Sequence, residues 1–86
     1  MDLISFLLEV DGGRQTFEAK AATLEALHEF EPTSRLAQEA HNMGFVSMFE
    51  MQPDSTTGSR LPVIVEVGTI TAKGKKYLAD SEQGPR

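Results

Sequence analysis

Residues 45–67, FVSMFEMQPDSTTGSRLPVIVEV, hold two apolar runs on either side of a polar segment. The first run, 45–51, alternates loosely between apolar and polar residues, and the second, 61–67, is rich in β-branched residues, which favour strands. The segment between them, 53–59, is made of proline, aspartate, serine, threonine and glycine, which are typical of turns. We therefore predict a long β-hairpin with a polar tip.

Two helices are expected on the N-terminal side of this hairpin. The first covers at least 23–30, where leucines and a phenylalanine recur on one face. Glu31-Pro32 should end it, because proline pushes the residue before it out of the α region. The second covers about 33–43, and Gly44 suits a left-handed C-cap position after it.

The N-terminal segment, 2–10, reads as a helix that the glycines at 12 and 13 stop. Its apolar side chains cover more than half of the circumference, which is wide for a surface helix of a monomer. Since a chain of 86 residues has a small core, we expect a homodimer that buries this wide face. The residues expected at the dimer interface are Leu3, Ile4, Leu7 and Leu8.

Residues 14–22 allow two interpretations. Polar and apolar residues roughly alternate over 15–20, which is typical of a short edge strand, but the alanines and glutamates are also suited to the start of a long helix. After the hairpin, Thr71 is a suitable cap for a last helix over 72–79. We assign one domain to 1–79 and a flexible tail to 80–86.

Two stretches of the chain resemble the winged helix-turn-helix family. LAQEAHNMGFV, 36–46, looks like the end of a recognition helix that leads into the first wing strand. ITAKGKKYL, 70–78, is similar to the L-T-x-x-G-x-x-x-L segment that follows the wing in many small bacterial and phage members. The resemblance covers about 2–79. It implies an α+β winged helix with a three-helix core, a long β-hairpin wing and a short C-terminal helix.

The family includes transcriptional regulators, so the resemblance implies contacts with double-stranded DNA through the helix at 33–43, the wing tip and the lysines after the wing. Arginine, glutamine and asparagine side chains can read base edges, and lysines can neutralise phosphates. Carried over by position, the DNA-binding residues are Arg35, Gln38, His41, Asn42, Arg60, Lys73, Lys75 and Lys76.

The charge of the chain favours a different role. Thirteen acidic residues stand against eight lysines and arginines, which gives a net charge of −5, and the imbalance lies in residues 1–44. Domains that bind nucleic acid are usually basic, whereas an acidic face more often meets a basic protein. The family also contains many domains that bind only protein. The alternative prediction is therefore a protein-interaction or assembly module that keeps the fold and does not bind DNA.

Other classes of function lack their motifs. The chain has no cysteine, and its two histidines, His28 and His41, fall short of the ligands that a zinc site usually needs. No glycine-flanked nucleophile and no phosphate-binding loop is present. We therefore expect no enzyme activity, no metal and no cofactor. The apolar runs are too short to span a membrane and the N-terminus does not resemble a secretory signal, so we expect no membrane contact and a cytoplasmic location.

Overall fold

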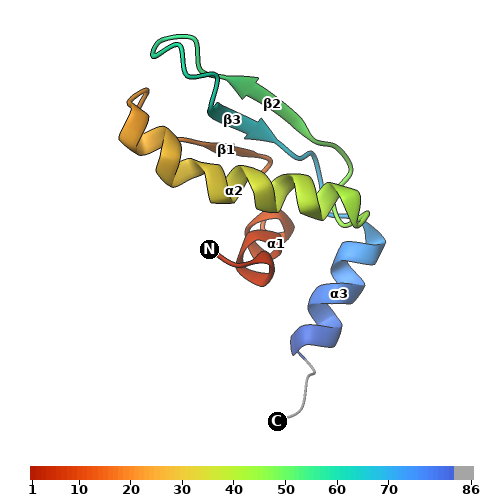
Figure 1. Ribbon diagram of the computed structural model, residues 1–86. Coiled ribbons are helices and arrows are strands. Elements are labelled where there is room, and N and C mark those ends of the chain that lie inside the picture. Colours follow the sequence, from red (N-terminus) through yellow and green to blue (C-terminus); the bar gives the residue numbers. More distant parts are fainter. Residues whose placement is uncertain (83–86) are drawn as a thin grey trace.

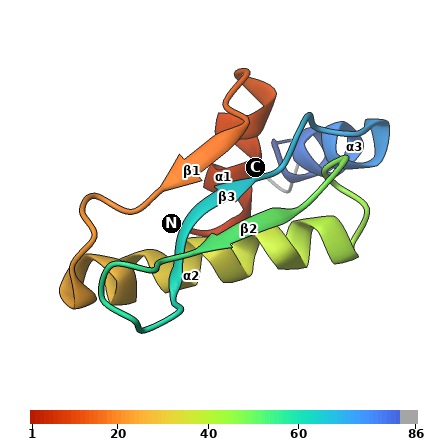
Figure 2. The ribbon, with the colours of Figure 1, turned by 90° about the horizontal axis from the view of Figure 1, so that it is seen from above.

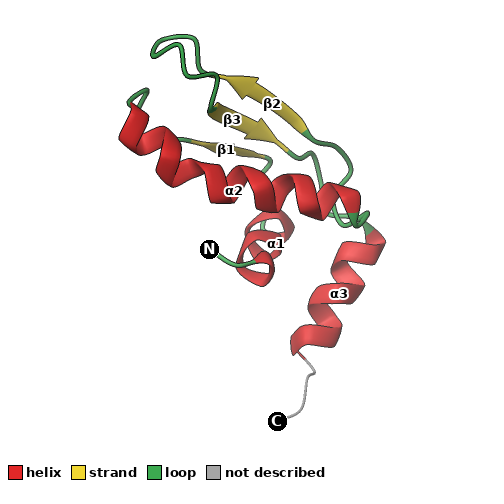
Figure 3. Cartoon of the chain, viewed as in Figure 1, coloured by secondary structure: helices red, strands yellow, loops and turns green. Residues whose placement is uncertain are grey.

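The computed structural model describes residues 1–82, which form three helices and three strands (Figure 1). In chain order these are α1 (Leu3–Asp11), β1 (Thr16–Glu18), α2 (Leu24–Asn42), β2 (Glu50–Pro53), β3 (Pro62–Glu66) and α3 (Ala72–Glu82). The strands form an antiparallel sheet in the order β1-β3-β2, and β2 and β3 follow one another in the chain as a hairpin (Figure 3). The α+β class predicted from the sequence is confirmed.

The core lies between the sheet and the helices. The helix α2 runs along one face of the sheet, and α1 packs against both α2 and α3 (Figure 1). Within the core, the rings of Phe6 and Phe17 stack with their centroids 4.7 Å apart, which joins α1 to β1. Side chains from every helix and from β1 and β3 contribute to one apolar cluster: Phe6, Leu7, Val10, Phe17, Phe30, Ala37, Ala40, Phe45, Val46, Val65, Val67 and Leu78.

The ambiguous segment at 14–22 contains a strand. β1 pairs antiparallel with β3, and Phe17 lies opposite Val65 with both side chains buried. The following helix begins only at Leu24, because Thr23 takes an extended conformation and its hydroxyl accepts a hydrogen bond from the Ala26 N–H at 3.2 Å. An N-cap of this kind fixes the first residue of a helix.

The two helices predicted at 23–30 and 33–43 are one helix, so the prediction that Pro32 ends a helix was wrong. The physical reason lies on the opposite side of α2, where Phe30, Ser34 and Ala37 are buried in one line that continues past the proline. Pro32 is exposed, so its ring points to solvent, and its missing N–H leaves one gap in the backbone ladder. Burial of these side chains before and after Pro32 keeps the backbone helical despite the missing hydrogen bond.

The predicted hairpin is present, but its first strand is shorter than 45–51. β2 covers only Glu50–Pro53, and the residues before it pair irregularly: Ser47 donates its N–H to the Thr69 carbonyl, and Val46 forms an isolated bridge with Ile70. Gly68 causes the irregularity, since its φ of 66° lies in the left-handed region. A Cβ there would lie 2.2 Å from the Ser47 Oγ, so only glycine fits.

The second of the two resembling stretches, 70–78, contains the start of α3 and is hydrogen-bonded to the turn after α2. The Thr71 hydroxyl donates to the carbonyl of Gly44 at 2.6 Å and accepts from the Gly74 N–H at 3.0 Å. α3 comes so close to this turn that a Cβ at Gly74 would lie 2.4 Å from the Phe45 carbonyl oxygen. The threonine and glycine of this segment therefore have structural roles.

The boundary predicted for the last helix also changes. α3 continues through Glu82, so residues 80–82 belong to the helix and not to the expected tail. The rest of the predicted tail, 83–86, lies outside the described residues.

Replacing Pro32 with alanine tests the continuity of α2. The free energy of unfolding should rise by about 2 kcal/mol, because an interior helix proline costs about 3 kcal/mol and the more flexible unfolded chain offsets about 1. Urea denaturation followed by circular dichroism measures the change. Glu39→Ala, an exposed site on the same helix, is the control and should change stability by less than about 0.5 kcal/mol. A loss of stability in Pro32→Ala would mean that the proline sits in a turn.

Candidate functional site

The residues expected to read DNA bases lie on the exposed side of α2. Arg35, Gln38 and Asn42 are exposed, as is His41 near the end of the helix. The guanidinium of Arg35 forms an ion pair with Glu31, one turn earlier on the helix. The one arginine on this face is therefore already partnered by a carboxylate of the same helix.

The remaining cations expected to contact DNA do not lie together. Arg60 is in the loop between β2 and β3, at the end of the molecule where α2 begins (Figures 1 and 2). Lys73, Lys75 and Lys76 are exposed on α3, which starts at the other end of α2. Lys73 lies beside Gly44, with its ammonium 5.9 Å from the centre of the Phe45 ring. The structure thus splits the predicted phosphate contacts between two ends of the molecule.

The predicted dimer interface on α1 includes a residue of the core. The side chain of Leu7 is 0% exposed in the single chain, so Leu7 is part of the core of this chain. Leu3 and Ile4 are half-buried and pack against the core, and Leu8 is 46% exposed. The wide apolar arc seen in the sequence arises because α1 contacts two other helices, α2 and α3.

The tip of the hairpin is an ordered turn built on one carboxylate. Asp54 is only 5% exposed, and its Oδ2 accepts hydrogen bonds from the Thr57 N–H at 2.8 Å and the Thr57 hydroxyl at 2.6 Å. These hydrogen bonds hold the pKa of the Asp54 carboxyl below its ordinary value. The backbone around it needs left-handed residues at Gly58 and Arg60. Asp54 therefore has a structural role in the loop.

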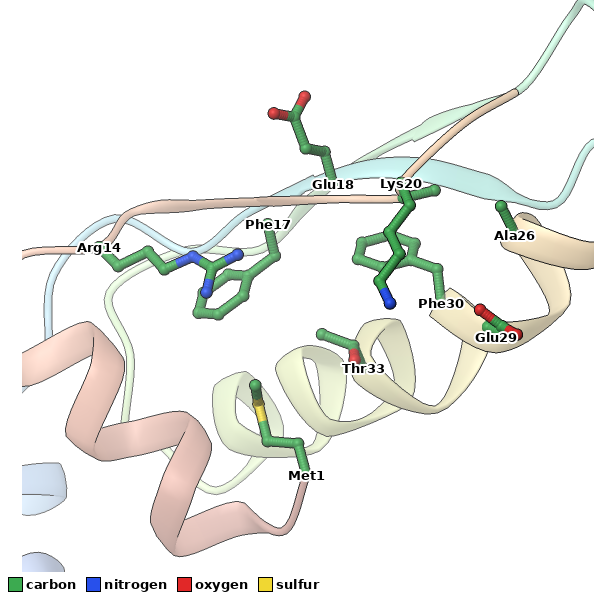
Figure 4. A pocket seen from close by; sticks show the side chains of 10 residues that line it. Met1, Arg14, Phe17, Glu18, Lys20, Ala26, Glu29, Phe30 and Thr33 are labelled. Atoms are coloured by element: carbon green, nitrogen blue, oxygen red, sulfur yellow. The ribbon is translucent and has the colours of Figure 1, made fainter. Parts of the chain in front are cut away.

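A pocket of about 160 Å³ lies between the free edge of β1 and the first half of α2 (Figure 4). The side chains of Phe17 and Phe30 form its apolar floor, and Arg14 and Lys20 lie at its two ends. The guanidinium of Arg14 stacks 4.2 Å from the centre of the Phe17 ring and pairs with Glu9. The complete lining is Met1, Arg14, Phe17, Glu18, Ala19, Lys20, Ala26, Glu29, Phe30 and Thr33.

The face of the sheet away from the helices is acidic. Glu50 lies directly opposite Glu66 across β2 and β3, and Glu18 on β1 shares the same face through its pairing with Ile64. Like charges opposite one another in a sheet are unfavourable. In residues 1–82 the ion pairs are Arg14–Glu9 and Arg35–Glu31, so none of these three glutamates is neutralised by a cation of the described chain.

The amino-acid sequence alone indicated neither the pocket nor this acidic face. Both depend on β1, which the pattern at 14–22 left undecided between strand and helix. Phe17 between the polar residues Thr16 and Glu18 was the available signal, since alternation places the phenylalanine on one face and the polar pair on the other.

Two further kinds of site were considered in the sequence, a metal site and a membrane-spanning helix. Within residues 1–82, no three histidine, aspartate or glutamate side chains gather closely enough to hold a metal ion. None of the described helices has the length and apolar character required to span a bilayer.

Comparisons of the chain with known protein families, with curated proteins and with solved structures find no match. The winged-helix resemblance therefore stays a prediction.

The two neighbouring leucines of α1 should respond differently to truncation. Leu7→Ala should lower the free energy of unfolding by about 2–5 kcal/mol, because it leaves a cavity in the core. Leu8→Ala should lower it by less than about 1 kcal/mol, because Leu8 is partly in solvent. Urea denaturation of both variants at the same protein concentration measures the difference. Equal losses would contradict the orientation of α1.

The turn at Asp54 should depend on pH. Its pKa in the folded chain lies below the ordinary value of 3.8, so the stabilisation is complete above about pH 3.8 and is lost as pH falls through the lower, folded pKa. The amide resonance of Thr57, followed by NMR from pH 6 to pH 2, should titrate with a midpoint below 3.8. Asp54→Asn should abolish this titration. A midpoint above 3.8 would contradict the hydrogen bonds from Thr57 to the Asp54 carboxylate.

Proposed function

We propose that this chain is a protein-interaction module with a winged-helix framework in which the second and third helices are fused into α2. The order of its elements supports the framework: a helix, a short strand, a helical region, a hairpin and a last helix follow one another as the sequence resemblance implies. The roles of Thr71 and Gly74 at the junction of α2 and α3 give the resembling segment a physical basis.

The observation that carries the proposal is the continuity of α2. A recognition helix enters the major groove because a turn sets it apart from the helix before it. Here the side chains of Phe30 and Ala37 are buried on the same line, which ties both halves of α2 to one core. No turn frees the segment with Arg35 and Asn42 to dock as a separate helix.

The distribution of charge supports the same proposal. DNA binding draws most of its affinity from cations that neutralise phosphates. Arg35 is paired with Glu31, Arg60 and the lysines of α3 lie at different ends, and the open sheet face carries glutamates. A surface of this kind is complementary to a basic protein and repels a phosphate backbone.

DNA binding is the second candidate function, and one observation favours it. Arg35, Gln38 and Asn42 are all exposed on a helix of 19 residues, long enough to cross a major groove. In that case α2 would dock as a rigid rod, and Lys73, Lys75 and Lys76 would contact one flank.

A titration of the protein into a randomised DNA duplex at about 50 mM salt, followed by fluorescence anisotropy, distinguishes the two functions. The interaction module should show no saturable binding, because few phosphates can be neutralised. A DNA-binding protein that engages three or four cations should bind with a log–log salt slope of about −3, at ~0.9 per phosphate. Binding that weakens in Arg35→Ala and in Lys75→Ala would overturn the proposal, and Lys20→Ala, outside the expected DNA surface, is the matched control.

A further inference from the structure

The free edge of β1 offers backbone groups that do not pair with β3. The Gln15 carbonyl accepts from the Val67 N–H, and the Ala19 N–H donates to the Val63 carbonyl, each at 2.9 Å. Because backbone groups alternate in direction along an antiparallel strand, those of Thr16 and Glu18 point away from β3. Arg14 Nε donates to the Thr16 carbonyl oxygen at 3.3 Å, which agrees with this direction, and an added strand would replace the Arg14 side chain there. An extended chain laid beside β1 would find these groups facing it.

The two edges of the sheet differ. β2, at the other edge, ends in Pro53, and its register shifts between Gln52 and Pro53. Proline and irregular pairing are common ways in which proteins protect an edge strand from further pairing. β1 has neither, since Thr16, Phe17 and Glu18 pair in regular register with β3. Of the two, β1 is the edge suited to accept another strand.

The pocket lies where an added strand would place a side chain. A residue opposite Phe17 would point to the same face of the sheet as Phe17, toward the floor formed with Phe30 (Figure 4). The volume of about 160 Å³ is close to that of a cavity of roughly 150 Å³ that holds benzene. It therefore suits one aliphatic or aromatic side chain.

The opposite face of the added strand would be next to carboxylates. Its residues opposite Thr16 and Glu18 would point to the outer face, where Glu18 is exposed and Glu66 and Glu50 continue the surface across the sheet. The net charge of −5 adds a general attraction for cations. Basic side chains at these alternate positions would be complementary to this face.

We propose that the free edge of β1 and the pocket beside it bind an extended segment of a partner protein, with an apolar side chain in the pocket and basic side chains over the acidic sheet face. The inference rests on the proposed function, since it names where and how the interaction module binds. Main-chain hydrogen bonds to an edge strand supply affinity in this mode of recognition, and the pocket supplies specificity.

The test uses a capped nine-residue peptide, Thr-Lys-Val-Lys-Leu-Lys-Val-Lys-Thr, titrated into the whole labelled protein and followed by NMR. Binding should perturb the amides of 14–20 and slow hydrogen exchange at Thr16 and Glu18 by at least about tenfold, as expected for amides that gain a partner. The same peptide with aspartate in place of the central leucine, and a third with glutamates in place of the lysines, should each bind at least about tenfold more weakly.

Three variants of the protein separate the contributions. Ala26→Phe fills the pocket, and Ala21→Phe, at an exposed position that does not line the pocket, is its matched control. Thr16→Pro removes an outward N–H without breaking a bond to β3. Glu18→Lys reverses the charge at the edge. Ala26→Phe, Thr16→Pro and Glu18→Lys should each weaken binding of the lysine-containing peptide at least about tenfold. Ala21→Phe should bind this peptide like the parent protein. Circular dichroism checks that each variant is folded.

The outcomes distinguish this inference from the proposed function. Absence of saturable binding up to about 1 mM peptide, the Kd of a marginal complex, overturns the inference. Perturbations confined to the exposed face of α2, or binding unchanged in Ala26→Phe and Thr16→Pro, also overturn it and leave the proposed function standing. Saturable binding to randomised duplex that weakens in Arg35→Ala and in Lys75→Ala overturns the proposed function, whatever the peptide does.

Discussion

The line of side chains that α2 buries on both sides of Pro32 is the constraint on which the rest of the structure depends. Phe30, Ala37 and Ala40 reach the same apolar cluster, so one rigid helix spans the length of the sheet. Its N-terminal half forms one wall of the pocket beside β1. Just after its C-terminal end, the Gly44 carbonyl accepts a hydrogen bond from the Thr71 hydroxyl. Because α2 continues through Pro32 without a turn, it fixes the positions of both the pocket and α3.

The same constraint organises the charges. Because α2 is continuous, the loop between β2 and β3 lies at one of its ends and α3 at the other, and the cations of these two segments are kept apart. The glutamates of β1, β2 and β3 share the face that no helix covers. A separation of this kind favours recognition of a protein over recognition of a regular array of phosphates, and it places the acidic face next to the open edge of β1.

The sequence was sufficient to predict the hairpin, the last helix and the α+β class, because local patterns decide them. It failed where tertiary contacts override local preferences. The rule that proline ends a helix is a preference of the isolated chain, and burial of Phe30 and Ser34 outweighs it. The wide apolar arc of α1 did not reveal that this helix contacts both α2 and α3 of the same chain, with Leu7 in the core. The homodimer stays a prediction. The pocket involves Met1, β1 with the residues beside it, and α2, so no single stretch could reveal it.

The most direct test of the account is the backbone conformation of residues 30–35, read from Cα chemical shifts of the whole protein in solution. A continuous α2 should give helical shifts without interruption from Leu24 to Asn42, and slow amide exchange at Ser34 and Arg35. A return to random-coil shifts at 31–33, with fast exchange there, would show two helices joined by a turn. That result would contradict the continuous α2 and restore a separate recognition helix.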